Sequence, residues 1–106
     1  MSNAPLSEQF RKASEDWCDK EAAASLLEES KSAVLATRMA ALGDIPINRA
    51  ERDVKASMEW QRYIDCMCKA RADANKAKVH VEYLRMKFWE FSGGEATKRL
   101  EMRMTS

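Results

Sequence analysis

A heptad repeat that runs unbroken from Trp60 to Phe91 constrains this chain more than any other feature of its sequence. Its apolar residues recur at the first and fourth positions of every seven, as Trp60, Met67, Ala74, Val81 and Phe88, and as Tyr63, Ala70, Ala77, Leu84 and Phe91. This spacing places one stripe of a long helix against a partner. The sequence therefore predicts an all-α fold in which that stripe is buried.

The partner of the stripe is predicted to be the N-terminal part of the same chain. Residues 1–48 carry a net charge of −3 and residues 49–106 carry +4, within a total of +1. Helices of opposite charge in one chain favour pairing with each other. Such pairing also uses basic residues that would otherwise be available to nucleic acid.

A fold-back of the two halves in antiparallel orientation gives a consistent register. It sets Glu28 opposite Arg71 and Trp17 opposite Leu84, and it gathers small residues around Ala24 where the helices approach most closely. The predicted architecture is a long antiparallel helical hairpin, similar to a coiled coil.

Polar residues and glycine mark the predicted helix ends. Ser7 and Ser57 are suited to begin helices, and Gly43 is suited to end one. Asn48 and Glu51 have the spacing of a capping box.

The pair Gly93–Gly94 after Ser92 predicts a break near the C-terminus, because glycine disfavours a helix interior. Short helices are therefore expected in the turn and at the C-terminus of the hairpin. The single domain, residues 1–106, is predicted to contain helices over about 7–42, 49–56, 58–91 and 95–104.

A second row of apolar residues runs along the long helix, on the side away from the heptad stripe. Its members are Cys68, Ala72, Val79, Tyr83, Met86 and Trp89. A two-helix hairpin cannot bury both stripes. The short helices would cover part of this row in one interpretation; we favour a homodimer that forms a four-helix bundle, with the row as an oligomer or partner interface.

No metal, cofactor or catalytic site is predicted. Cys66 and Cys68 point about 200° apart on a helix and cannot share one ion. The lone His80 has no acidic residue at ligand spacing on its own helix, and the chain has no glycine-rich phosphate loop. We therefore expect that the protein is not an enzyme.

Basic residues form a further candidate surface for phosphate contacts, made of Arg49, Arg52, Lys55, Arg62, Lys69 and Lys76. Helical proteins that bind nucleic acid present such rows. Asp65 and Asp73 interrupt the row, so an ordinary solvated helix face is the alternative interpretation.

Cysteine and hydropathy patterns predict a cytoplasmic protein. Three cysteines give no even set for disulfides, which favours a reducing compartment. No apolar run approaches the roughly 20 residues of a membrane span, and the N-terminus lacks a signal-peptide pattern. No membrane partner is expected.

Three segments carry a family resemblance: 51–60, 70–78 and 82–89, followed by Glu95-Ala-Thr. They resemble small uncharacterised helical proteins of tailed bacteriophages and prophages, over about residues 8–102. The resemblance implies a phage accessory protein that acts in the cytoplasm of its bacterial host. Together with the second apolar row and the basic residues, it leads us to expect action through protein or nucleic-acid binding in DNA metabolism or host takeover. The alternative is a purely structural or inhibitory protein–protein interaction module with no nucleic-acid contact.

Overall fold

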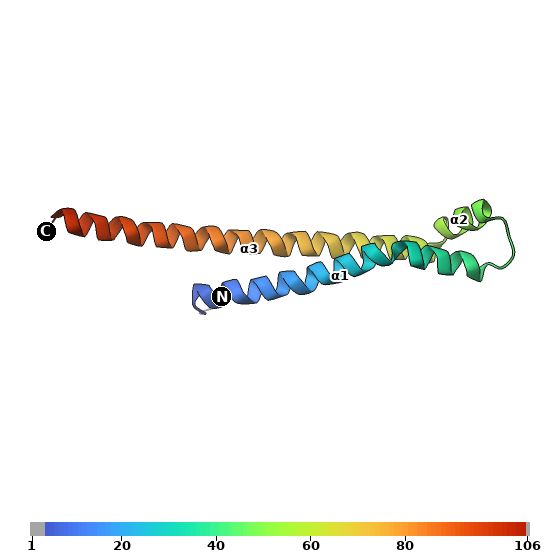
Figure 1. The fold of residues 1–106 in the computed structure, drawn as a ribbon, viewed down its shortest axis with the longest axis horizontal. Coiled ribbons are helices and arrows are strands. Elements are labelled where there is room, and N and C mark those ends of the chain that lie inside the picture. The colour runs from blue at the N-terminus through green and yellow to red at the C-terminus, as the bar shows by residue number, and fades with distance from the viewer. Residues whose placement is uncertain (1–3, 106) are drawn as a thin grey trace. The chain divides into compact units, whose positions relative to one another are not determined.

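The computed structural model describes the backbone of residues 4–105 and the side chains of residues 4–93. Three helices follow one another, α1 (Leu6–Ala41), α2 (Ile47–Lys55) and α3 (Met58–Thr105), and no strand occurs over those residues. Long helix α1 packs on α3, and α2 lies in the turn between them (Figure 1). The predicted all-α helical hairpin is thus confirmed.

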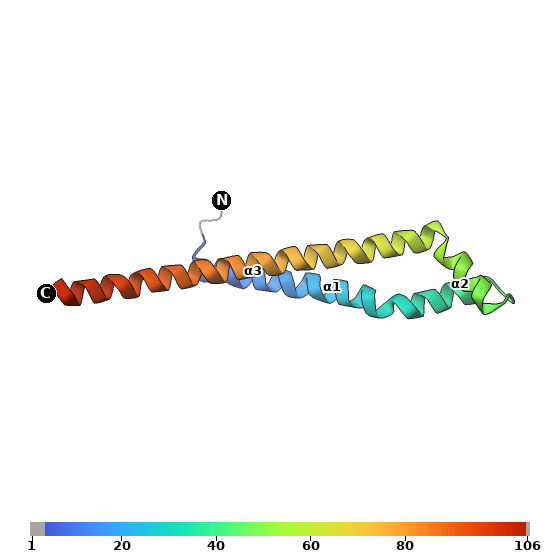
Figure 2. The ribbon, with the colours of Figure 1, turned by 90° about the horizontal axis from the view of Figure 1, so that it is seen from above.

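The chain divides into two compact units, each with a stretch of α1 and a stretch of α3. Unit 1 combines residues 1–18 with residues 76–106, and unit 2 is formed by residues 19–75, which include α2. In unit 1, α3 continues past the start of α1 (Figure 2).

The core of unit 1 is a small apolar cluster. Ala13 of α1 is buried beside Val81 and Leu84 of α3, each of which is only 2% exposed. The half-buried side chains packed against this cluster are Leu6, Phe10 and Trp17. Trp17 thus packs against the cluster that contains its predicted neighbour Leu84, and burial of these apolar groups stabilises the contact of the helices.

The core of unit 2 is built mainly from small residues. Ala24 of α1 and Ala74 of α3 are fully buried, whereas Ala50 and Val54 are the buried face of α2. Trp60, at the start of α3, is the one large aromatic residue buried in the described part of this unit. Small side chains allow the helix backbones to approach closely.

Two of the predicted helix ends are confirmed. Gly43, just beyond α1, has φ of 89°, a left-handed conformation that glycine adopts without steric cost. Ser57 caps α3, because its Oγ accepts a hydrogen bond of 3.2 Å from the backbone N–H of Trp60.

Two other predicted caps are wrong. Helix α1 begins at Leu6, so Ser7 lies inside its first turn rather than before it. Helix α2 begins after Pro46 with no side-chain hydrogen bond at its cap, so Asn48 and Glu51 do not form a capping box. The ring of Pro46 fixes φ at −55°, close to the helical value, and the helix starts one residue before Asn48.

The predicted break at Ser92-Gly93-Gly94 is also wrong, because α3 continues to Thr105. A glycine costs only about 1 kcal/mol relative to alanine in a helix interior, and the residues that follow are mostly good helix formers. The expected separate helix over residues 95–104 is therefore the end of α3. Its side chains lie outside the described residues.

The predicted seam also ends earlier than expected. Phe88 and Phe91 were expected in the buried stripe, but 48% and 62% of their surfaces are exposed. At this end of unit 1 the aromatic side chains of α1 and α3 do not pack tightly together. An open pocket lies between Phe10 of α1 and Phe88 of α3.

Candidate interaction surface

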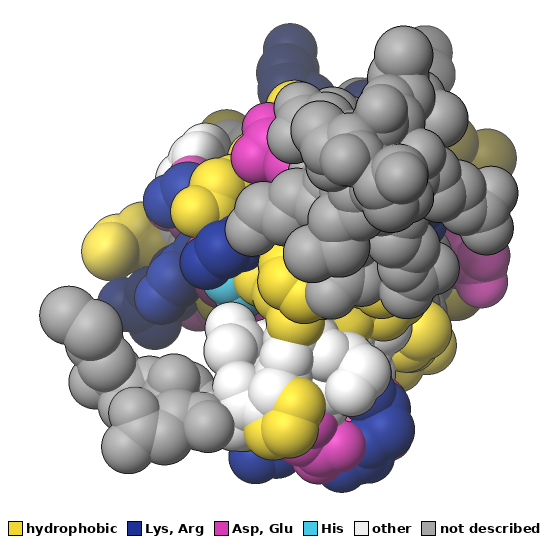
Figure 3. Space-filling view, turned by 90° about the vertical axis from the view of Figure 1, so that its left-hand side faces the viewer, with side chains coloured by type: hydrophobic (Ala, Val, Ile, Leu, Met, Phe, Trp, Pro, Cys, Tyr) yellow, Lys and Arg dark blue, Asp and Glu magenta, His cyan; other side chains and the backbone are white. Residues whose placement is uncertain are grey.

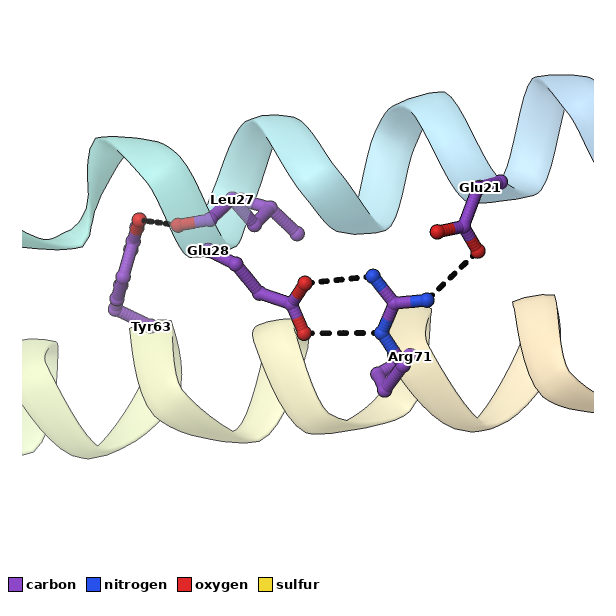
Figure 4. Close-up of polar contacts among 5 residues, drawn as sticks. All are labelled: Glu21, Leu27, Glu28, Tyr63 and Arg71. Carbon is purple, nitrogen blue, oxygen red and sulfur yellow. Dashed lines mark hydrogen bonds and ion pairs between the residues drawn. The ribbon is translucent and has the colours of Figure 1, made fainter.

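One arginine joins α1 to α3 in unit 2 (Figure 4). Nε and Nη2 of Arg71 donate hydrogen bonds of 2.9 and 2.6 Å to the two carboxylate oxygens of Glu28, and Nη1 donates one of 2.7 Å to Glu21. These bonds lower the pKa of Glu28 and raise the pKa of Arg71. The predicted Glu28–Arg71 pair is confirmed, so Arg71 serves the fold rather than a partner.

A second cross-helix bond lies close to the first. The hydroxyl of Tyr63 donates a hydrogen bond to the backbone carbonyl of Leu27 (Figure 4). The Tyr63 ring stacks on Trp60, with ring centroids 5.6 Å apart. Tyr63 and Arg71 therefore lie on the face of α3 that meets α1 in unit 2.

The second apolar row is open to solvent along its whole length. The residues of the row, Cys68, Ala72, Val79, Tyr83, Met86 and Trp89, are all exposed. In unit 1, the exposed fractions are 63% for Val79 and 67% for Trp89. Because α-helical residues advance by about 100° each, Val79 points away from buried Val81, so the row faces away from α1 at this position. A row of large apolar side chains on the surface is typical of a contact site.

The six predicted phosphate-contact residues fall into two groups. Two of them form ion pairs along α2. Nε of Arg49 lies 3.9 Å from Oδ2 of Asp53, and Nζ of Lys55 lies 2.8 Å from Oε1 of Glu51. The other four are exposed and form no ion pair with any described residue: Arg52, Arg62, Lys69 and Lys76. Of these four, Arg52, Arg62 and Lys69 belong to unit 2 and Lys76 belongs to unit 1.

The possible metal ligands do not gather. Cys18, Cys66 and Cys68 are exposed free thiols. Among the described residues, no group of three or more ligating side chains is placed to hold an ion. The ring of His80 stacks on Tyr83, with centroids 6.5 Å apart, which places it beside the apolar row.

An apolar pocket in unit 1 was not predicted from the sequence. It encloses about 400 Å³ between the first turns of α1 and a turn of α3, and it is lined by Leu6, Ser7, Phe10, Arg85, Phe88 and Trp89. Hydrophobic side chains are open to solvent at this end of the molecule, beside Lys and Arg (Figure 3). The sequence holds a partial indication of the pocket, because Arg85 and Trp89 are one helical turn apart on the same helix.

No protein-family model matches this chain, and neither a curated protein nor a solved structure is similar to it. Over the described residues, none of the three helices carries a hydrophobic segment able to span a membrane. Inference about function therefore rests on the surfaces described above.

Proposed function

We propose that this chain is a non-enzymatic interaction module that forms a homodimer through the second apolar row of α3. In this proposal it is a phage or prophage accessory protein of the bacterial cytoplasm, acting in DNA metabolism or host takeover. The observation that carries the proposal is the exposure of the row. Free thiols at all three cysteines agree with a reducing compartment.

The size of the exposed side chains supports a dimer. Val79, Tyr83, Met86 and Trp89 lie within eleven residues of one helix and are each more than half exposed. Aromatic residues and methionine are enriched at the centres of protein interfaces, where they contribute most of the binding energy. A copy packed on this face would add two helices to the hairpin and complete a four-helix bundle.

Sedimentation velocity on a matched pair of variants tests the dimer. V79E places a charge in the row, whereas S32E adds the same charge at an exposed residue of α1 outside the row. We expect the wild type and S32E to sediment as dimers at micromolar concentration and V79E as a monomer. A monomeric wild type would refute the dimer, and equal effects of the two variants would refute its placement on this row.

Nucleic-acid binding is a second candidate, favoured by four basic side chains that are exposed and form no ion pair within the described part of the chain: Arg52, Arg62, Lys69 and Lys76. Phosphate contacts make affinity fall steeply with salt. Reversal of charge at Arg62, Lys69 and Lys76 should abolish DNA binding, whereas the same net change at the exposed residues Lys12, Lys31 and Lys87 should not. Absence of binding to single- and double-stranded DNA at low salt would leave the purely protein-binding alternative.

That alternative, a structural or inhibitory module without nucleic-acid contact, has its own test. A partner captured from host lysate should remain bound after nuclease treatment and should be lost with V79E but not with S32E. Capture that disappears with nuclease would favour the nucleic-acid candidate instead.

A further inference from the structure

The pocket in unit 1 is lined in part by apolar side chains that also pack in the core of the unit. Leu6 and Phe10 line it from α1, and both also pack against the buried cluster of Ala13, Val81 and Leu84. On the α3 side, Phe88 and Trp89 line it with large parts of their surfaces exposed. A ligand would therefore meet preformed aromatic surface anchored to the core of the unit.

One cation of this apolar lining has no partner among the described residues. Arg85 is exposed and forms no ion pair or side-chain hydrogen bond with any residue described in the structure. The arginine of α1 in the same unit differs, because Arg11 pairs with Glu8 and, at 2.7 Å, with Glu15. The guanidinium of Arg85 is thus free to bind a carboxylate in bidentate fashion.

The start of α1 adds to this positive character. Ser7, in its first turn, lines the pocket, and a helix N-terminus carries partial positive charge. Glu8, the acidic residue of that turn, is already held by Arg11. An apolar ligand that carries a negative charge is favoured over a neutral or cationic one.

We propose that this pocket binds an acidic peptide segment of a partner protein, with a large apolar side chain of the segment between Phe10 and Phe88 and a carboxylate of the segment on Arg85. The pocket volume is at the small end of ligand sites, which range from roughly 300 to 1,000 Å³, so it suits one anchoring side chain. Exposed Trp89 extends the contact to the rest of the peptide.

This inference rests on the proposed role as an interaction module, but it uses different residues. Of the pocket lining, Trp89 alone also belongs to the second apolar row. Loss of the dimer and loss of peptide binding can therefore be observed separately.

Two synthetic amphipathic helical peptides provide the test. Both carry one leucine anchor, flanked by glutamates in the first peptide and by lysines in the second. Binding to the full-length protein is followed by the indole N–H resonances of its three tryptophans in ¹⁵N–¹H spectra, with that of Trp89 assigned from W89F. The variant R85E is compared with K87E, which makes the same charge change at an exposed residue of α3 outside the pocket lining.

We expect the glutamate peptide to shift the Trp89 resonance and to bind wild type and K87E alike. R85E should bind this peptide at least about tenfold more weakly and should now prefer the lysine peptide, because like charges are replaced by opposite ones. Sedimentation of R85E should match that of the wild type. No shift at Trp89, equal binding of both peptides, or equal effects of R85E and K87E would each overturn the proposal. A shift of the Trp89 resonance that appears without peptide as the protein concentration rises would also overturn the proposal, because it would indicate that a second copy of the protein occupies the pocket.

Discussion

Arg71 of α3 binds two carboxylates that lie two turns apart on α1, Glu21 and Glu28. This arrangement fixes the register of the helices in unit 2, since a shift of one residue would break the bidentate bond to Glu28.

Replacement of this arginine should destabilise the hairpin in a salt-dependent manner. We expect R71Q to lower Tm by a few degrees at low salt and by less at high salt, because Arg71 is 29% exposed and screening weakens its ion pairs. The control R62Q removes an exposed arginine of the same helix with no ion pair to a described residue, and should leave Tm nearly unchanged. Thermal unfolding by circular dichroism measures both. Equal losses in the two variants would contradict a specific role for Arg71.

Acid should weaken the same contact. The hydrogen bond from Arg71 lowers the pKa of Glu28 below its ordinary value of 4.5 in the folded state. A carboxyl with a depressed folded pKa stabilises the protein above its unfolded pKa, and this contribution is lost as the pH falls through the lower folded value.

The variant E28Q should therefore have a lower Tm than the wild type at neutral pH, and the difference should shrink as the pH falls below 4.5. Glu29, exposed and adjacent, provides the control E29Q. A difference between E28Q and wild type that stays constant from pH 7 to pH 3 would show that the carboxylate charge is not what matters.

Two glycine-to-alanine substitutions should act in opposite directions. G43A forces alanine into a left-handed conformation at φ of 89° and should cost about 1 kcal/mol of unfolding free energy. Gly93 lies inside α3, and no described atom lies within 4 Å of the position that an alanine Cβ would take, so G93A should add about 0.5–1 kcal/mol to helix stability. Urea unfolding measures the sign. A destabilising G93A would indicate that α3 is interrupted at this position.

Loss of the cap on α3 should also be measurable. S57A removes the acceptor for the N–H of Trp60 and should cost about 1 kcal/mol. S32A, at an exposed position inside α1, is the matched control and should be neutral or slightly stabilising, since alanine is the better helix former. Equal stability of the two variants in urea would contradict the cap.

Much of the fold could be predicted from periodicity and charge. The heptad identified Val81 and Leu84 as core, and charge matching identified the pair Glu28–Arg71. The end of the seam was harder to predict, because burial of Phe88 and Phe91 depends on how closely the aromatic ends of two helices pack. A heptad pattern gives the direction of each side chain but not the gap between the helices.

The prediction that Gly93 and Gly94 end the helix was wrong for a different reason. Glycine lowers helix stability by a limited amount, so flanking residues decide whether a helix stops at Gly93. The pocket escaped prediction because it needs Leu6 and Phe10 placed against Phe88 and Trp89, from opposite ends of the sequence. The apolar row of α3 was identified residue by residue from the sequence, and its six side chains are exposed in the structure; its role as an interface stays a prediction.

The fully buried alanines of unit 2 have a consequence for how this protein tolerates change. Ala24 and Ala74 have no exposed surface, so an added methyl or ethyl group at either would push two helix backbones apart. Enlarging the smallest core residues should therefore destabilise this unit, as trimming its largest buried residue would. In unit 2 of this hairpin the two helices must pack closely, so its smallest buried side chains are the ones that tolerate enlargement least.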